Sequence, residues 1–152
     1  MEMKARDELA VQLGNIVSEA GRIIMAVQAS DMGARRKADG SPVCDADLKA
    51  EQLILARLAA IMPGVTVIAE ESFAPNGGSP LPERFLLVDP LDGTRGFLAG
   101  DGDFTVNIAL IEKGDPIVGA VCVPALDQVY LAGATAFRAD LAAGGALPPL
   151  TP

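Results

Sequence analysis

Four apolar residues, Phe85 to Val88, run directly into the sequence Asp89-Pro90-Leu91-Asp92-Gly93-Thr94. The apolar run predicts a buried strand, and its end then delivers two carboxylates and a hydroxyl to one region of space. Pro90 has a fixed φ and no N–H, so we expect the chain to leave the sheet there. Gly93 lets the backbone approach a ligand, and a helix can begin after it, whose first N–H groups favour an anion. Carboxylates for a metal beside amides for a phosphate indicate metal-assisted phosphate chemistry.

The composition favours one soluble domain. The chain has 152 residues, half of them hydrophobic, and a formal charge of −8. This charge argues against a nucleic-acid surface and against adhesion to anionic lipid through a basic patch. No apolar run approaches the roughly 20 residues of a membrane span, and the charged N-terminus does not resemble a signal peptide. We therefore expect a cytoplasmic protein without a transmembrane segment. Peripheral contact with the inner face of the cell membrane is the alternative.

The residue types available restrict the possible metal chemistry. The sequence contains no His, which excludes His-based zinc sites and His general bases. Its two cysteines, Cys44 and Cys122, lie far apart and without metal-type spacing, so we expect free thiols. A bound metal is then a hard cation held by oxygen, for which Mg²⁺ is the natural choice.

Two amphipathic helices are predicted in the N-terminal part. Apolar residues recur at intervals of three and four from Asp7 to Gln28, and again from Asp47 to Met62, where Pro63-Gly64 ends the pattern. Between them, the segment 37–47 is polar and rich in turn residues. Asp45 or Asp47 is expected either to cap the second helix or to lie near an active site, and the sequence gives the two interpretations about equal weight.

Strands dominate the rest of the chain. A short buried strand is expected at 65–69 and a long one at 104–111, followed by strands at 116–123 and 129–132 that are joined by short turns. Short turns between strands make an antiparallel meander. The predicted fold class is α+β, with two N-terminal helices layered on an antiparallel sheet. Residues 1–138 form the predicted domain, and 139–152, which have no periodicity, are expected to be a linker or an interrupted segment.

The acids at two strand ends suggest a two-metal phosphatase. Asp89 and Asp92 can aim at one metal or at a metal pair, with the carbonyl of Leu91 as a third oxygen ligand and Glu70, from the end of the strand at 65–69, as a fourth. In two-metal hydrolases, cations about 3.5–4 Å apart polarise the phosphate and activate an attacking water. Asp89 is the candidate bridging ligand. Thr94 and Glu70 are candidates for holding that water.

The amides of Gly93 and Thr94 are candidates for binding the phosphate at the helix start. An ordinary helix entry, with Asp92 as N-cap and Asp89 exposed to solvent, is the competing interpretation of Asp-Gly-Thr. The wholly apolar strand before it and the second acidic strand end favour the metal site.

These motifs resemble the inositol monophosphatase superfamily of Mg²⁺-dependent, lithium-sensitive phosphatases. The resemblance lies in the sequence 89–94, in Glu70-Glu71-Ser72, and in the segment 37–47, where Cys44 replaces a common threonine. The sequences 102–111 and 119–125 look most like the 3'(2'),5'-bisphosphate nucleotidases of that superfamily.

The resemblance implies a role for each of these residues. Metal ligands for two or three Mg²⁺ ions would be Glu70, Asp89, the Leu91 carbonyl and Asp92. Glu70, Thr94 and the more distant Asp47 would serve catalysis. Contacts to the substrate would come from Glu70, Leu91, Asp92, Gly93 and Thr94.

The resemblance also implies a substrate and a missing partner domain. The substrate would be a bisphosphorylated nucleoside, 3'-phosphoadenosine 5'-phosphate, hydrolysed to AMP and phosphate. An inositol monophosphatase-like sugar phosphatase and a non-catalytic metal- or phosphate-binding fragment are the alternatives. The superfamily completes its site with an aspartate after a Trp in a C-terminal domain, but this chain has no Trp. We therefore expect an N-terminal portion with weak turnover, whose exposed apolar surface favours a homo-oligomer.

Overall fold

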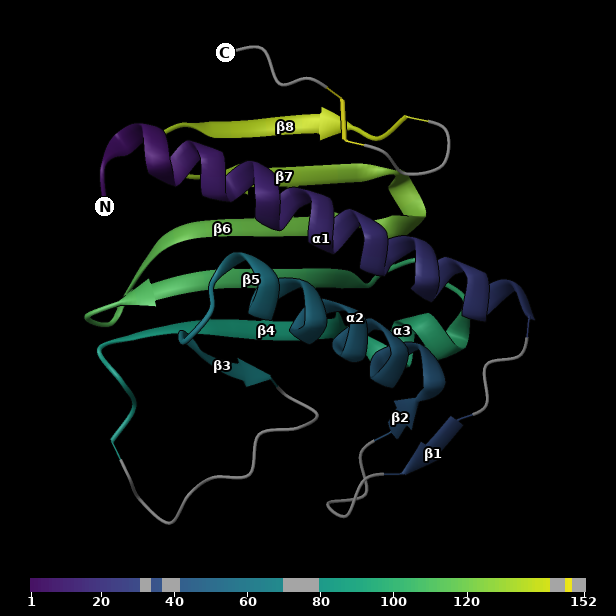
Figure 1. Cartoon of the computed structure of the whole chain (residues 1–152). Helices are drawn as coiled ribbons and strands as arrows, with labels where there is room; N and C mark the ends of the chain where they lie inside the picture. Colours follow the sequence, from purple (N-terminus) through teal and green to yellow (C-terminus); the bar gives the residue numbers. More distant parts are fainter. Residues whose placement is uncertain (31–33, 37–41, 70–79, 143–146, 149–152) are drawn as a thin grey trace.

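Two helices, α1 (Met3–Ser30) and α2 (Asp45–Ile61), cover one face of a six-stranded sheet (Figure 1). The computed structural model describes residues 1–30, 34–36, 42–69, 80–142 and 147–148. The strand order in the sheet follows the sequence from β3 to β8. The strands are β3 (Thr66–Ala69), β4 (Arg84–Asp92), β5 (Thr105–Glu112), β6 (Asp115–Val123), β7 (Gln128–Ala132) and β8 (Ala136–Asp140). The α+β class predicted from the sequence is confirmed.

Short elements lie beside this framework. Strands β1 (Ala34–Arg36) and β2 (Pro42–Cys44) pair antiparallel ahead of α2. Helix α3 (Thr94–Ala99) follows β4, and a 3₁₀ turn, η1 (Pro124–Leu126), joins β6 to β7. In Figure 1, α3 and the β1–β2 pair lie at the same end of the sheet. Residues 37–41 of the turn-rich segment 37–47 lie outside the described residues.

The predicted helices are confirmed, with α1 extending a few residues further at both ends. Their apolar faces pack on the sheet because residues three and four apart share one side of a helix. In α2 that buried face also carries two acids, since Asp47 is 1% exposed and Glu51 is 5% exposed. The buried apolar residues of the two helices are Leu9, Ala10, Leu13, Ile16, Val17, Ala20, Ile24, Val27, Ala46, Ala50, Ile54 and Leu58.

Buried and more exposed side chains alternate along the strands β5, β6 and β7. In β5, Val106, Ile108 and Leu110 are buried under the helices, and the residues between them are half-buried on the opposite, open face. The open face carries exposed apolar side chains. Leu87 in β4 is 46% exposed and Tyr130 in β7 is 42% exposed, although the sequence predicted that residues 85–88 would all be buried. Among the described residues, helices cover one face of β4 and leave Leu87 on the other.

One strand pairing differs from the predicted antiparallel sheet. β3 runs parallel to β4, with Thr66 opposite Phe85 and Ala69 opposite Val88. The chain between Ala69 and Arg84 is 14 residues long by sequence number, which is enough for the return that a parallel pair requires. Both strands therefore run toward the same end of the sheet.

Strand β8 was not predicted from the sequence. It pairs antiparallel with β7, and its last residues, Ala139 and Asp140, lie beyond the expected domain boundary at 138. Ala139 is buried, because it continues the helix-facing row of the sheet. An Ala-rich stretch gives little sequence signal for a strand, and β-pairing decided its structure instead.

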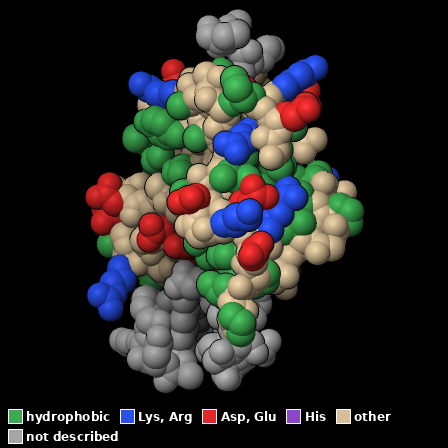
Figure 2. Space-filling view, turned by 90° about the vertical axis from the view of Figure 1, so that its left-hand side faces the viewer, with side chains coloured by type: hydrophobic (Ala, Val, Ile, Leu, Met, Phe, Trp, Pro, Cys, Tyr) green, Lys and Arg blue, Asp and Glu red, His purple; other side chains and the backbone are tan. Residues whose placement is uncertain are grey.

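Charged side chains of both signs are interspersed at one end of the sheet, which Figure 2 shows. On β4 and β5, Arg84 Nε lies 3.9 Å from Glu112 Oε1, and on the helices Arg57 makes two hydrogen bonds to Glu19, of 2.8 and 3.1 Å. Exposed pairs of this kind contribute at most about 1 kcal/mol each.

Across the described part of the chain, none of the helices has the length and apolar character needed to cross a membrane.

Cys122 of β6 packs against helix α1. It is buried in β6, and a Cβ added to Gly21 of α1 would lie only 3.1 Å from its Sγ, so the glycine allows this close approach. Burial raises the pKa of the Cys122 thiol to about 12, with a further contribution from the charge of Asp127. The predicted free thiol is confirmed for Cys122, and the side chain of Cys44 lies outside the described part.

The buried thiol predicts a loss of stability at alkaline pH. Below pH 8 the thiol is protonated in both the folded and the unfolded chain, and stability does not depend on it. Between the ordinary thiol pKa of about 9 in the unfolded chain and the folded pKa of about 12, only the unfolded chain releases this proton, so the free energy of unfolding falls as pH rises.

We expect the unaltered chain to lose more stability than Cys122→Ala between pH 8 and pH 10.5, by up to about 1.4 kcal/mol per pH unit. Urea unfolding of both chains under reducing conditions measures the difference. Parallel pH profiles of the two chains would contradict the prediction.

Candidate active site

An extra residue in β4 shapes the end of that strand. Asp89 lies opposite Asn107 of β5 and Asp92 lies opposite Thr105, so two β4 residues face the single residue Val106. This is a β-bulge, which accommodates Pro90 without a ladder hydrogen bond. The prediction that the chain leaves the sheet at Pro90 is wrong, because β4 continues to Asp92.

The bulge brings the two aspartates to the same side of the sheet. In a regular strand, residues three apart point to opposite faces. Asp89 and Asp92 instead pair with Asn107 and Thr105, which are two apart and share the open face. Asp89 is half-buried and Asp92 is exposed. The side chain of Leu91, between them, is 1% exposed in the core.

Gly93 makes the turn from β4 into α3. Its φ of 90° lies in the left-handed region, and a Cβ there would lie 2.5 Å from the carbonyl oxygen of Asp103. Phe97 anchors the short helix, since it is fully buried and packs edge-on against Phe104 with ring centroids 5.3 Å apart. Gln28 of α1 donates a hydrogen bond of 3.1 Å to the Phe97 carbonyl. Backbone amides at the start of α3 thus have a fixed position.

Thr94 connects this turn to α2. Its hydroxyl lies 3.2 Å from the carbonyl oxygen of Leu91 and 3.4 Å from Oδ2 of Asp47. Asp47 is in the first turn of α2, and it is buried, whereas Asp45 in the same turn is exposed. The structure therefore puts the Asp47 carboxylate beside the site, while Asp45 stays at the solvent-exposed helix start.

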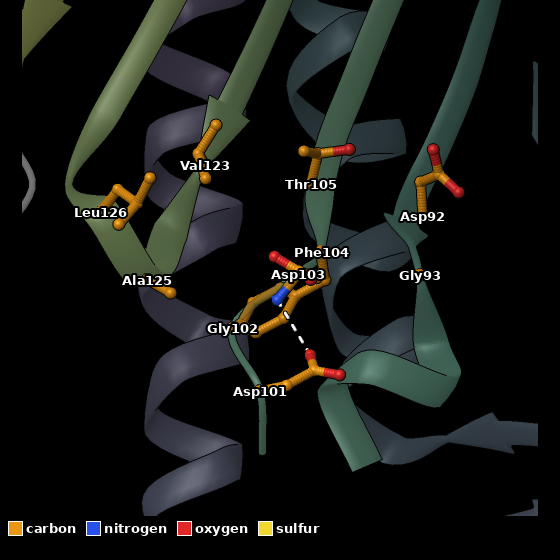
Figure 3. Close-up of a pocket in the computed structure, with 10 residues that line it drawn as sticks. All are labelled: Asp92, Gly93, Asp101, Gly102, Asp103, Phe104, Thr105, Val123, Ala125 and Leu126. Atoms are coloured by element: carbon orange, nitrogen blue, oxygen red, sulfur yellow. Dashed lines mark hydrogen bonds between the residues drawn. The ribbon is translucent and has the colours of Figure 1, made fainter. Parts of the chain in front are cut away.

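A cavity of about 540 Å³ opens next to Asp92 and Gly93 (Figure 3). Its far side is formed by the turn of Asp101 and Asp103, in which Asp101 Oδ1 accepts a hydrogen bond of 3.0 Å from the Asp103 amide. The remaining lining residues are Gly102, Phe104, Thr105, Val123, Ala125 and Leu126.

The predicted ligands fall into two groups. Asp89, Leu91 and Asp92 lie in the last four residues of β4, and Thr94, which follows the strand, contacts Leu91 and Asp47. Glu70, predicted as a metal ligand and a catalytic residue, lies outside the described residues, as do Glu71 and Ser72. Within the described ranges, no three Asp, Glu, Cys or His side chains lie close enough to hold a metal ion.

The chemistry of the donors present fits a hard divalent cation. Asp89 and Asp92 offer carboxylate oxygens from one face, and the Leu91 carbonyl, which already accepts from Thr94, has a second lone pair. Oxygen ligands of this kind suit Mg²⁺, which keeps several waters and binds through one or two carboxylates. Asp89, Leu91 and Asp92 are the described residues that would hold it.

Sequence reasoning missed two neighbours of the site, Thr105 and Asn107. Both were expected only as residues on one face of a strand, and both lie opposite the candidate ligands. The register between β4 and β5 is the signal that identifies them. A regular register extended past Pro90 would have assigned the wrong partner to Asp92, because the bulge shifts it by one residue.

Comparison with known proteins agrees with this architecture. The sequence model of the Inositol monophosphatase family matches residues 4–141. The chain is 42% identical over 123 residues to "3'(2'),5'-bisphosphate nucleotidase CysQ" of Salmonella typhimurium, which covers 80% of this chain and 50% of that protein. It is 40% identical over 106 residues to "Inositol-1-monophosphatase" of Mesorhizobium japonicum, covering 68% of this chain and 39% of that protein.

A solved structure shows the same fold. The crystal structure of CysQ from Bacteroides thetaiotaomicron superimposes with a TM-score of 0.76 and 29% sequence identity, covering 95% of this chain and 52% of that chain. The chain spans about half the length of the curated relatives it matches. The match of the family model over most of the sequence, together with the shared fold, shows that the chain belongs to the inositol monophosphatase family.

Proposed function

We propose that this chain carries the metal- and phosphate-binding half of a Mg²⁺-dependent phosphatase that removes the 3'-phosphate of 3'-phosphoadenosine 5'-phosphate. The observation that carries the proposal is the β4 bulge, which turns Asp89 and Asp92 to one face next to the Leu91 carbonyl. Glu70 is proposed as a further ligand. The products would be AMP and inorganic phosphate.

Divalent cations, when bound by these oxygens, supply positive charge that polarises the phosphate and makes a neighbouring water more acidic. The chain itself positions the reacting groups. Asp89 and Asp92 would hold the cations from one face of the sheet. The amides of Gly93 and Thr94 at the start of α3 donate hydrogen bonds to the phosphate oxygens and so balance its charge.

Thr94 and Asp47 are proposed to orient the attacking water. The Thr94 hydroxyl can donate a hydrogen bond to Asp47 or to the Leu91 carbonyl. Its oxygen is then free to accept a hydrogen bond from the water. Burial of Asp47 keeps this contact away from competing bulk water. Glu70 is proposed to accept a hydrogen bond from the second O–H of the water, which would fix its orientation.

The substrate assignment depends on the relatives. Relatives that are 42% identical to this chain carry the name "3'(2'),5'-bisphosphate nucleotidase CysQ", and this supports a bisphosphorylated nucleoside. The similarity to an "Inositol-1-monophosphatase" favours a sugar-phosphate substrate as the second candidate. A module that binds the cation and phosphate without turnover is the third, and the partial coverage of the relatives motivates it.

Phosphate release with Mg²⁺ distinguishes these candidates. We expect release from 3'-phosphoadenosine 5'-phosphate to exceed that from inositol 1-phosphate at equal concentration. The reverse order would support the sugar phosphatase. Calorimetric binding of Mg²⁺ and inorganic phosphate with no release from either substrate would identify the binding module.

Asp89→Asn tests the metal site. The change keeps the shape of the side chain and removes the charge, so we expect Mg²⁺ binding to be lost and phosphate release to fall on the order of 10³-fold, equivalent to several kcal/mol of stabilisation. Asp115→Asn, at the exposed start of β6, is the matched control and should leave both unchanged. Equal effects of the two substitutions would rule out Asp89 as a ligand.

Thr94→Ala tests the orientation of the water. Removal of the hydroxyl is expected to lower kcat by about 10²-fold with little change in Mg²⁺ affinity, because the cation ligands remain. Thr94→Ser, which retains the hydroxyl, should recover most of kcat. A loss of kcat that Thr94→Ser shares in full would contradict the role of the hydroxyl.

A further inference from the structure

Two residues of β5 stand directly across from the candidate metal ligands. Asn107 is the partner of Asp89, and Thr105 is the partner of Asp92. Directly opposite residues of an antiparallel pair have Cβ atoms about 4.5–5.5 Å apart and point to the same face. The four side chains therefore form a quartet on the open face of the sheet, two acids on β4 and two hydrogen-bonding residues on β5.

A hydrogen bond links the two β5 residues. Asn107 Nδ2 donates to Thr105 Oγ1 over 2.9 Å, and both side chains are half-buried. An amide nitrogen carries two hydrogens, so one N–H of Asn107 remains after this contact. A hydroxyl oxygen that accepts still has its own hydrogen to donate, and in Figure 3 the Thr105 hydroxyl lies toward the β4 strand and Asp92.

Each opposite pair also shares a cavity. Asp92 and Thr105 line the cavity of about 540 Å³ beside Gly93. Asp89 and Asn107 line a second cavity, of about 420 Å³, whose other lining residues are mostly apolar. Because both members of each pair border the same space, donor and carboxylate can meet there without displacing core atoms.

The residue types argue against simple strand packing. Asn is depleted in strands, where β-branched residues pack better on a half-buried surface. The next residue along this row of the sheet is Val121, opposite Asn107 on β6. An amide at this point therefore costs strand stability that a Val would not, and a role at the ligands accounts for it.

We propose that Asn107 and Thr105 are positioning residues for the metal ligands. The second N–H of Asn107 donates to the Asp89 carboxylate, and the Thr105 O–H donates to the Asp92 carboxylate. These bonds fix which carboxylate oxygens face the cation. The inference rests on the proposed function and extends it from the ligands to the strand that orients them.

Calorimetric titration of the metal-free chain with MgCl₂ tests the proposal. We expect Thr105→Val, which keeps the side-chain shape, to weaken Mg²⁺ binding about 10–100-fold, the usual cost of losing a hydrogen bond to a metal ligand. Thr105→Ser should restore the affinity to within about threefold. Thr66→Val, the same chemical change on β3, is the matched control and should bind like the unaltered chain. Thermal unfolding in EDTA checks that the variants remain folded.

Asn107→Leu provides a second, independent variant. We expect a similar loss of affinity, and the double variant with Thr105→Val should lose less than the product of the two single losses, because the residues act through one network. Equal affinities of Thr105→Val, Asn107→Leu and Thr66→Val would overturn the inference while leaving the proposed function intact. Failure of the unaltered chain to bind Mg²⁺ would instead contradict the proposed function, and this inference with it.

Discussion

The β-bulge at Pro90 and Leu91 is the constraint on which the rest of the site depends. Without the extra residue, Asp89 and Asp92 would lie on opposite faces, one of them against the helices. With it, both carboxylates face outward while Leu91 stays in the core. Proline is suited to this position, because a bulge residue does not need its N–H for the ladder. A single insertion thus places two carboxylates on one face of an ordinary strand end.

The helices α1 and α2 support the turn that follows β4. Helix α2 brings the buried Asp47 to the Thr94 hydroxyl, and α1 reaches α3 through Gln28. Phe97 is fully buried, so the turn at Gly93 rests on the main core. Groups that must stay within a fraction of an ångström for catalysis are best supported by such packed elements. The site borders the sheet, while its supports come from both helices.

The sequence was sufficient for elements with a strong periodic signal. The helices α1 and α2 and the strand β5 have regular apolar intervals, and they lie close to the expected bounds. The motif at 89–94 also identified the family to which the chain belongs. Pairing could not be derived this way, since the parallel β3 and the bulge in β4 depend on contacts between distant segments. Strand β8 was missed because its Ala-rich sequence has little intrinsic preference, and Thr105 and Asn107 were unrecognised because register defines their neighbours.

The close packing of α3 on the following turn has a consequence for sequence variation in this family. The Asp103 carbonyl oxygen occupies the space that a Cβ on Gly93 or on Gly96 would need, 2.5 and 2.8 Å from those positions. Surface turns ordinarily tolerate insertions and deletions. Here a change in the length of the turn would open a gap beside both glycines or force a collision with them. Loop length and glycine content at this point are expected to change together across related sequences, as one inherited unit.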